Sequence, residues 1–228
     1  KSVAIIAVDP SSPFNFGALM GDRIRMSQHF NHPKVFIRSM ASRGALGGLS
    51  PKIIEVSDLI KAAGFDYLFI ETVGVGQSEV EVAGVADTTV VVVVPEAGDE
   101  IQTMKAGLME IADIFIVNKA DRDNADAFVK NLRALAHSRP QGEWEIPVIK
   151  SVATQQAGVH EIIKAIEKHH RVVSGQQQKH VLLLAEKAYQ LIQHRRMKDV
   201  LKQQLQQEIQ ALIQDKTFNL YRYISTKS

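Results

Sequence analysis

The sequence predicts an α/β protein with three layers, in which helices cover both faces of a mostly parallel sheet. Short apolar, often β-branched runs alternate with longer stretches in which apolar residues recur every three or four positions. The short runs are apolar at successive positions, as is typical of strands buried on both faces of a parallel sheet. The longer stretches have the period of amphipathic helices. Right-handed crossovers between such elements place the carboxyl ends of all strands at one rim.

The elements can be assigned in chain order. Strands are expected at residues 3–8, 35–37, 67–70, 88–94, 114–117 and 148–149. Helices are expected at residues 53–63, 101–111, 125–136 and 159–169. Polar residues that directly follow the strands are therefore the first candidates for a functional site.

The tetrad Asn118-Lys119-Ala120-Asp121 follows the strand at residues 114–117. An ionised Asp121 carboxylate only accepts hydrogen bonds, so it suits the two donors on the N1 and N2 edge of guanine and opposes an acceptor on adenine. Asn118 can offer its amide to the base or brace the neighbouring phosphate loop, and the methylene stem of Lys119 can lie flat against the purine. A polar loop without a ligand is the alternative, because short motifs recur by chance.

A second polar segment, Ser151-Val152-Ala153, follows the strand at residues 148–149. In a guanine site, a backbone amide of this segment would contact the O6 atom of the base. The same residue types are also common after strands that bind nothing.

Acidic residues end or follow strands in the first half of the chain. Glu71 ends the strand at residues 67–70, where its oxygens suit Mg²⁺ held directly or through a water. Asp9 could orient an attacking or metal-bound water, and Asp22 could complete the Mg²⁺ shell. Gly74 lacks a Cβ, so its N–H could approach a γ-phosphate and release the loop when that phosphate is lost. Turn and helix-cap chemistry is the alternative for these acids.

The segments VDPSSPF, GDRIRM, ETVGVGQSE, PEAGDEIQ and NKAD together resemble the methylmalonyl-CoA mutase-associated GTPases, the MeaB/ArgK/MMAA family. The resemblance runs from Lys1 to about Lys168 and continues more weakly beyond. It implies a P-loop-type G domain that hydrolyses GTP to GDP and phosphate with Mg²⁺. Such a protein acts as a chaperone that gates adenosylcobalamin loading and protects an acyl-CoA mutase, here expected to be methylmalonyl-CoA mutase. The resemblance places Asp9, Asp22 and Glu71 in the Mg²⁺ and hydrolysis site, with Asp9 and Glu71 as its catalytic residues.

The resemblance also implies two switches. Val75, Gln77 and Glu79 would belong to the second switch of the G domain. Asp99 and Lys105 would belong to an additional switch that relays nucleotide state to the mutase, because an acid and a base on a mobile loop can re-pair when a neighbouring loop moves. Adenosylcobalamin is expected only through the partner enzyme.

The sequence departs from the family at the phosphate loop. The family carries GxPGxGKST before the VDPSS strand, whereas no G-x-x-x-x-G-K-[ST] occurs in the 228 residues. That loop supplies the N–H groups, the lysine and the hydroxyl that hold the phosphates and Mg²⁺. We expect the first strand and the phosphate loop to precede Lys1, and this chain alone to be inactive. A degenerate relative that has lost hydrolysis is the alternative.

The composition changes after residue 173, where glutamines separate apolar residues at helical spacing. We therefore expect an incomplete G domain at residues 1–173 and a helical arm at 174–228, used for dimerisation or partner binding. The apolar stripe of the arm must be buried on the G domain or on a second subunit, and the family resemblance favours a homodimer. His169-His170 has no partner at ligand spacing and is interpreted as a helix end.

Composition narrows the partners and the compartment. The chain has 27 Lys and Arg against 25 Asp and Glu, for a formal charge of +2, so no nucleic acid partner is expected. The absence of cysteine excludes disulfides, CxxC metal sites and thiol nucleophiles within the sequence. No stretch approaches the roughly 20 apolar residues of a membrane span. These features predict a cytoplasmic protein, or a mitochondrial matrix protein if the source is a eukaryote.

Two other functions stay open. The same surfaces could form a non-catalytic module that binds a guanine nucleotide or the mutase without turnover. The second possible function is a GTPase that serves another metallocentre, for example by delivering nickel. The lack of cysteine and of a histidine-rich tract counts against this function.

Overall fold

The computed structural model describes residues 1–9, 26–41, 52–72, 81–95, 106–138, 144–174, 177–214 and 218–227. The chain divides into two compact units, Lys1–Lys187 and Ala188–Ser228. The boundary expected between residues 173 and 174 falls at the last residue of the helix Val159–Ser174, whereas the two compact units divide within the next helix, Gln177–Arg196. The functional division at 173 therefore stays a prediction.

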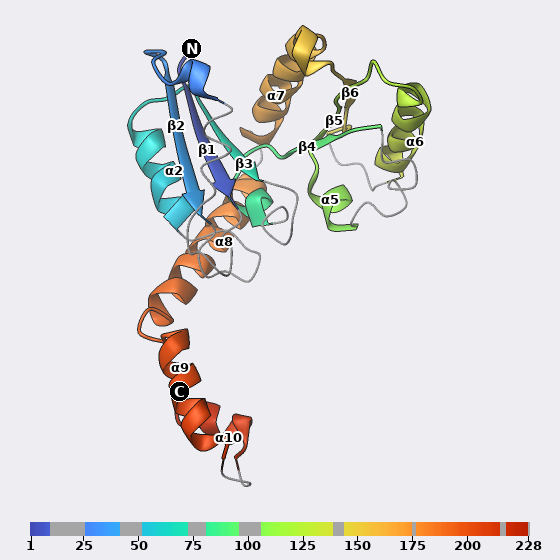
Figure 1. The fold of residues 1–228 in the computed structure, drawn as a ribbon. Helices are drawn as coiled ribbons and strands as arrows, with labels where there is room; N and C mark the ends of the chain where they lie inside the picture. The colour runs from blue at the N-terminus through green and yellow to red at the C-terminus, as the bar shows by residue number, and fades with distance from the viewer. Residues whose placement is uncertain are drawn as a thin grey trace. The chain divides into compact units, whose positions relative to one another are not determined.

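The first unit has the α/β architecture that the sequence predicts (Figure 1). Its strands are β1 (Val3–Asp9), β2 (Val35–Ala41), β3 (Tyr67–Thr72), β4 (Val90–Val93), β5 (Ile114–Val117) and β6 (Val148–Lys150). Its helices are α2 (Lys52–Ala62), α5 (Ala106–Ile111), α6 (Ala125–His137), α7 (Val159–Ser174) and the first part of α8 (Gln177–Arg196). Single 3₁₀ turns are η1 (Ser27–His29), η2 (Val82–Gly84) and η3 (Ala153–Gln155).

The strands form two three-stranded sheets, in the orders β2-β1-β3 and β4-β5-β6. Each pairing between these strands is parallel, as expected. The single sheet that the sequence predicts is thus divided, because β3 and β4 are not paired with each other and each is an edge strand among the described residues. Apolar side chains are exposed on these edge strands, with Phe69 of β3 45% exposed and Val92 of β4 58% exposed.

The register aligns the carboxyl ends of neighbouring strands. In the first sheet Ala7 of β1 pairs with Glu71 of β3, and Asp9 pairs with Ala41 of β2. In the second sheet Val117 of β5 lies between Val93 and Lys150 at the ends of its neighbours. In each sheet, the candidate site residues therefore lie at or directly after the rim formed by the carboxyl ends of the strands.

The core of the second sheet is formed by β5 and α6. Phe115 and Val117 are fully buried and cluster with Phe128 and Leu132 of the helix. The buried positions of α6 recur at three- and four-residue spacing, as the amphipathic pattern predicts. This packing fixes β5, and therefore the loop that follows it, against a rigid layer.

A buried polar network joins β4, β5 and α7 at the opposite ends of the strands. His169 is 1% exposed, with Nε2 lying 3.2 Å from Asp113 Oδ1 and Nδ1 lying 2.8 Å from the Thr88 hydroxyl. Asp113 also accepts a hydrogen bond from the Thr89 backbone, and its carbonyl accepts one from the Trp144 indole, each at 2.8 Å. The interpretation of His169 as a helix end was wrong, because it lies within α7 and its partners come from distant segments.

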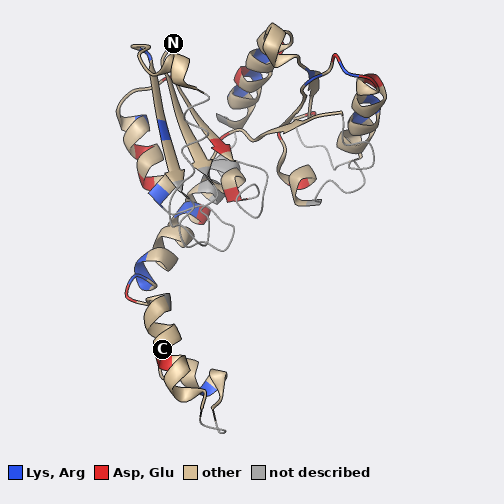
Figure 2. Ribbon diagram, in the orientation of Figure 1, with Lys and Arg blue, Asp and Glu red and all other residues tan. Residues whose placement is uncertain are grey.

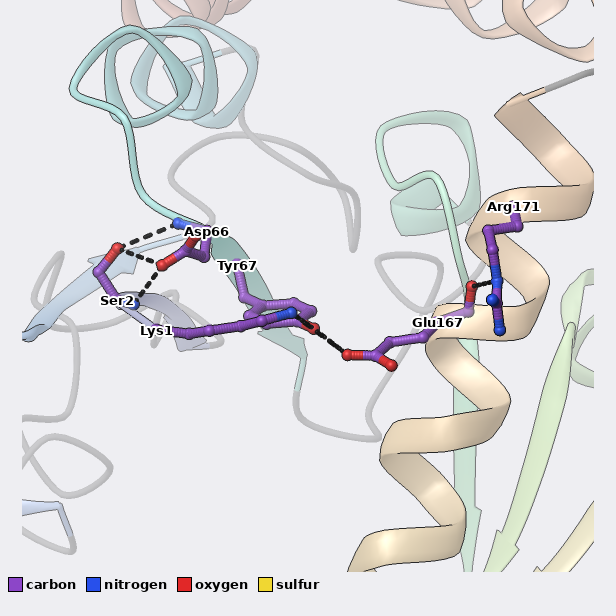
Figure 3. Close-up of polar contacts among 6 residues, drawn as sticks. All are labelled: Lys1, Ser2, Asp66, Tyr67, Glu167 and Arg171. Carbon is purple, nitrogen blue, oxygen red and sulfur yellow. Dashed lines mark hydrogen bonds and ion pairs between the residues drawn. The ribbon is translucent and has the colours of Figure 1, made fainter.

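A surface contact joins the start of β3 to α7 (Figure 3). The Tyr67 hydroxyl donates to Glu167 Oε1 at 2.8 Å, and Lys1 Nζ lies 3.3 Å from the same oxygen. Arg171 donates to the Glu167 backbone carbonyl at 3.3 Å. The hydrogen bond from Tyr67, followed by that from Lys1, holds the pKa of the Glu167 carboxyl below its ordinary value.

Replacing Tyr67 by Phe is expected to lower the melting temperature slightly at neutral pH and to have no effect in acid. Because the folded-state pKa of Glu167 is lowered, the stabilisation is fully present above the ordinary carboxyl pKa and is lost as the pH falls through the lowered pKa. The effect is small because the groups are exposed and screened by solvent. Thermal unfolding of both proteins at neutral pH and at about pH 2, well below the ordinary carboxyl pKa, tests this. A difference of equal size at both pH values would contradict it.

Charges of both signs are interspersed on α2, α6 and α7 (Figure 2). None of the helices among the described residues is long and apolar enough to cross a membrane.

The second unit contains the end of α8 together with α9 (Lys202–Leu212) and α10 (Leu220–Ser225). The Asn219 side chain caps α10 by accepting hydrogen bonds from the backbone of Tyr221 and Arg222. Glu208 of α9 accepts a hydrogen bond from Tyr223 and pairs with Lys227, each at 2.5 Å. Many apolar side chains of this unit are exposed, among them Ile192, Met197, Val200, Leu201, Leu212, Ile213, Leu220 and Ile224.

Candidate functional site

The loop at residues 118–121, called here the NKAD loop, begins where β5 ends. The Asn118 N–H donates to the Val93 carbonyl at 2.9 Å, and the Ala120 N–H donates to the Ser151 carbonyl at 3.0 Å. Lys119 between them has a φ of 56°, a left-handed conformation that is uncommon for a residue with a side chain. The loop is therefore held by β4 and by the residue that directly follows β6, and its sharp turn is fixed by backbone bonds.

The Asn118 side chain braces the loop that follows β6. Its Oδ1 atom accepts a hydrogen bond from the Ala153 N–H at 3.1 Å and one from the Ser151 hydroxyl at 3.3 Å. The sequence left two roles open for Asn118, contact with the base or bracing of the phosphate loop. The bracing contact that the structure shows is made to a different loop, the one after β6. The two segments predicted to surround guanine are thus in direct contact.

The backbone amides expected at guanine O6 already have acceptors in this structure. Ser151 N–H donates to the Val117 carbonyl at 2.9 Å, and Val152 N–H donates to the Ala157 carbonyl at 3.1 Å. Only the Ala153 N–H, of these three, has a side chain as its acceptor, the Asn118 amide. A side chain can rotate away more easily than a sheet carbonyl, so Ala153 is the amide best placed to change partners.

Asp121, the last residue of the NKAD loop, is exposed. Within the described part of the chain it has no hydrogen bond or ion pair. As far as the described residues go, both of its carboxylate oxygens can accept hydrogen bonds from a ligand. This combination of a rigid backbone and an unoccupied acceptor is what recognition of two neighbouring donors requires.

The carboxylate candidates Asp9 and Glu71 lie on neighbouring strands of the first sheet. Glu71 is exposed and is paired with Ala7, two residues before Asp9. The backbones of these two residues thus reach the same rim, as the sequence predicts for acids that end parallel strands. Asp22 lies outside the described residues.

The profile of the family described as methylmalonyl Co-A mutase-associated GTPase MeaB matches residues 1–210. The chain belongs to the MeaB family. The resemblance inferred from the sequence motifs is thereby confirmed.

Named relatives of this MeaB-family chain are GTPases of archaea and bacteria and a protein of an animal. A putative GTPase of Pyrococcus horikoshii is 51% identical over 173 residues, covering 74% of this chain and 55% of that protein. GTPase ArgK of Escherichia coli is 41% identical over 169 residues, covering 72% and 51%. The methylmalonic aciduria type A homolog, mitochondrial, of Caenorhabditis elegans is 36% identical over 171 residues, covering 73% and 43%. The chain spans about half the length of the curated relatives it matches.

Among solved structures, HypB from Helicobacter pylori in complex with nickel is similar to this chain in fold. The TM-score is 0.50 at 18% sequence identity, and the match covers 75% of each chain. This likeness supports the predicted α/β fold of the MeaB-family chain.

The switch residues predicted for the MeaB family lie outside the described residues. They are Gly74, Val75, Gln77, Glu79, Asp99 and Lys105.

Sequence reasoning missed a glycine at the end of the loop after β6. Gly158 has a φ of 81°, and a Cβ at this position would lie 3.1 Å from both the Lys150 carbonyl carbon and Ser151 Cα, and closer still to the Lys150 oxygen. The available signal was a glycine directly before the helix expected at residue 159, but that position alone does not reveal what the glycine contacts.

The described residues also form an open depression of about 570 Å³ beside β6. It is lined by Arg133, Val148, Ile149, Lys150, Gly158 and Glu161, and therefore lies beside the β6 backbone and not over Asn118 or Asp121.

Proposed function

We propose that the full-length protein to which this chain belongs is a Mg²⁺-dependent GTPase that converts GTP to GDP and phosphate. The observation that carries the proposal is the arrangement of the NKAD loop. The Asp121 carboxylate is exposed and has no partner among the described residues, while Asn118 is fixed to the segment after β6. Family membership and relatives named as GTPases support the same activity.

The base would be read by three parts of the site. Asp121 would accept hydrogen bonds from the N1 and N2 donors of guanine, and the stem of Lys119 would lie against the ring. When guanine enters, its O6 atom would replace the Asn118 amide as the acceptor of the Ala153 N–H. Ser151 and Val152 would shape this segment through their own backbone bonds, since both amides are already engaged.

Asp9, Asp22 and Glu71 would hold Mg²⁺. Carboxylate oxygens are the hard donors that this ion prefers, and β1 and β3 bring the backbones of Asp9 and Glu71 to one rim. The ion would neutralise charge on the phosphates as the γ-phosphate is transferred to water. Asp9 would orient the attacking water, and Gly74 would let its amide approach the γ-phosphate.

We further propose that the GTPase acts as a chaperone for a cobalamin-dependent acyl-CoA mutase, with methylmalonyl-CoA mutase as the expected partner. It would gate the loading of adenosylcobalamin, which it meets only through the mutase. The printed names of the family and of the animal relative support this partner class. Nucleotide state would be passed on by the second switch and the additional switch, through the residues Val75, Gln77, Glu79, Asp99 and Lys105.

The helical arm at residues 174–228 would carry a homodimer contact, and residues 1–173 would form the G domain. The exposed apolar residues of α9 and α10 support a partner for the arm. We also infer a cytoplasmic location, or the mitochondrial matrix in a eukaryote.

The test is calorimetric titration of the full-length protein with Mg²⁺·GDP and Mg²⁺·ADP, followed by measurement of GTP turnover. We expect selective GDP binding, and we expect Glu71→Ala to remove most of the Mg²⁺ dependence of nucleotide affinity. Asp199→Ala, which removes an exposed carboxylate from the turn after α8, is the matched control. Equal binding of GDP and ADP would refute guanine recognition. Selective GDP binding without turnover would instead support a non-catalytic module.

A further inference from the structure

The segment at residues 151–158, called here the β6–α7 loop, is closed at a narrow neck. Val152 and Ala157 face each other in an antiparallel bridge, with N–H to carbonyl distances of 3.1 and 3.2 Å. Gln156 has a φ of 57°, so the chain turns back sharply just before the second half of the bridge. The loop is therefore short, closed on itself and defined by its backbone.

Gly158 directly follows Ala157, the second residue of this neck, in the sequence. Its Cα faces the peptide between Lys150 and Ser151, and an added Cβ would be far inside the ordinary contact distance to the Lys150 carbonyl. The obstacle is backbone at the end of a paired strand and not the flexible end of a side chain. Any residue with a Cβ must push α7 and the end of β6 apart.

Ser151, whose N–H belongs to the peptide that Gly158 faces, also aligns the NKAD loop. Ser151 donates its N–H to the Val117 carbonyl at 2.9 Å and accepts the Ala120 N–H at 3.0 Å. Its hydroxyl donates to Asn118 Oδ1. Ser151 is 5% exposed, so it has little room to move without moving these partners. A displacement at Gly158 would therefore be transmitted through one residue to the base-reading loop.

We propose that Gly158 is a positioning residue for base recognition, which keeps the β6–α7 loop and the NKAD loop in the register that guanine requires. The inference rests on the proposed function, because it assigns a role within the guanine site. Gly158 itself touches no ligand. It acts through the Lys150–Ser151 peptide, whose N–H donates to Val117, and through the carbonyl and hydroxyl of Ser151, which bond to Ala120 and Asn118.

The experiment compares Gly158→Ala with Gly64→Ala in the full-length protein. Gly64 also has a positive φ, of 78°, but a Cβ there meets nothing within 4 Å. The control thus carries the same kind of backbone strain without the steric contact. We expect Gly158→Ala to lower GDP affinity and to reduce the preference for GDP over ADP by about tenfold, the scale of one hydrogen bond. Gly64→Ala should leave the preference unchanged.

The preference, and not the affinity alone, is the decisive readout. A merely structural role for Gly158 would lower the melting temperature and weaken both nucleotides equally, and that result would overturn the inference. If Gly158→Ala does not fold, Ala157→Gly loosens the same neck without adding an atom, and an unchanged preference in that variant would overturn it equally. A wild-type protein that does not prefer GDP would overturn both this inference and the proposed function. If the wild type does prefer GDP, the variants test the role of Gly158 alone.

Discussion

Asp121→Asn is expected to lower GDP affinity about 100-fold, the scale of two weakened hydrogen bonds to a charged acceptor. The carboxylate offers two acceptors to the N1 and N2 donors of guanine, whereas an amide offers one acceptor and one donor. The same change should raise affinity for XDP, because xanthine has a carbonyl in place of the 2-amino group and can accept from the new amide. Calorimetry of the full-length variant with GDP, XDP and ADP measures both effects.

Asp123→Asn is the matched control for this change. Asp123 is exposed in the same turn, two residues further along the chain, so its replacement removes the same charge without altering the proposed base acceptor. Its nucleotide preferences should remain those of the wild type. An unchanged preference for GDP over ADP in Asp121→Asn would remove Asp121 from the base site.

His169→Ala is expected to lower the free energy of unfolding by about 3 kcal/mol, from the cavity it leaves and from the loss of hydrogen-bond partners in a buried network. The imidazole is fully enclosed and contacts both Asp113 and Thr88. Its removal leaves the Asp113 carboxylate with one fewer partner in a largely buried position. Denaturant unfolding, followed by the fluorescence of the single tryptophan, Trp144, reports directly on this region.

His160→Ala provides the comparison, because His160 is exposed at the start of the same helix. Its effect should stay within roughly 0.5 kcal/mol, as for most surface substitutions. Equal losses for the two histidine variants would show that the buried network contributes little to stability.

The positions of the candidate base-reading residues could be predicted from sequence because their signals are local. Asn118 and Asp121 follow a continuous apolar strand, and that strand is β5 in the structure. The pairing of β5 with β6 then brings Ser151 beside Asn118, as a parallel sheet requires of adjacent strand ends. The bracing role of Asn118 towards Ala153 was less accessible, because it depends on the conformation of a loop closed by its own backbone bonds.

The features that sequence reasoning missed depend on contacts between distant residues. Gly158 is distinguished by the peptide it faces at Lys150, which only the folded loop brings near. His169 finds its partners at Thr88 and Asp113, and no spacing within one helix could indicate them. The division into two sheets likewise depends on which strands pair with each other in the folded protein, and the separate strand patterns in the sequence do not show this.

The edge strands β3 and β4 also bear on how the protein can be handled in solution. Each ends its sheet among the described residues, and Phe69 and Val92 on these strands are exposed to solvent. Open strand edges with apolar side chains are templates for pairing with other chains, which leads to oligomers without defined symmetry. A preparation limited to this segment is therefore expected to self-associate through its sheets. Size measurements on that segment would detect association through these two sheet edges. A dimer formed by the arm can therefore be recognised only in a protein in which β3 and β4 are both covered.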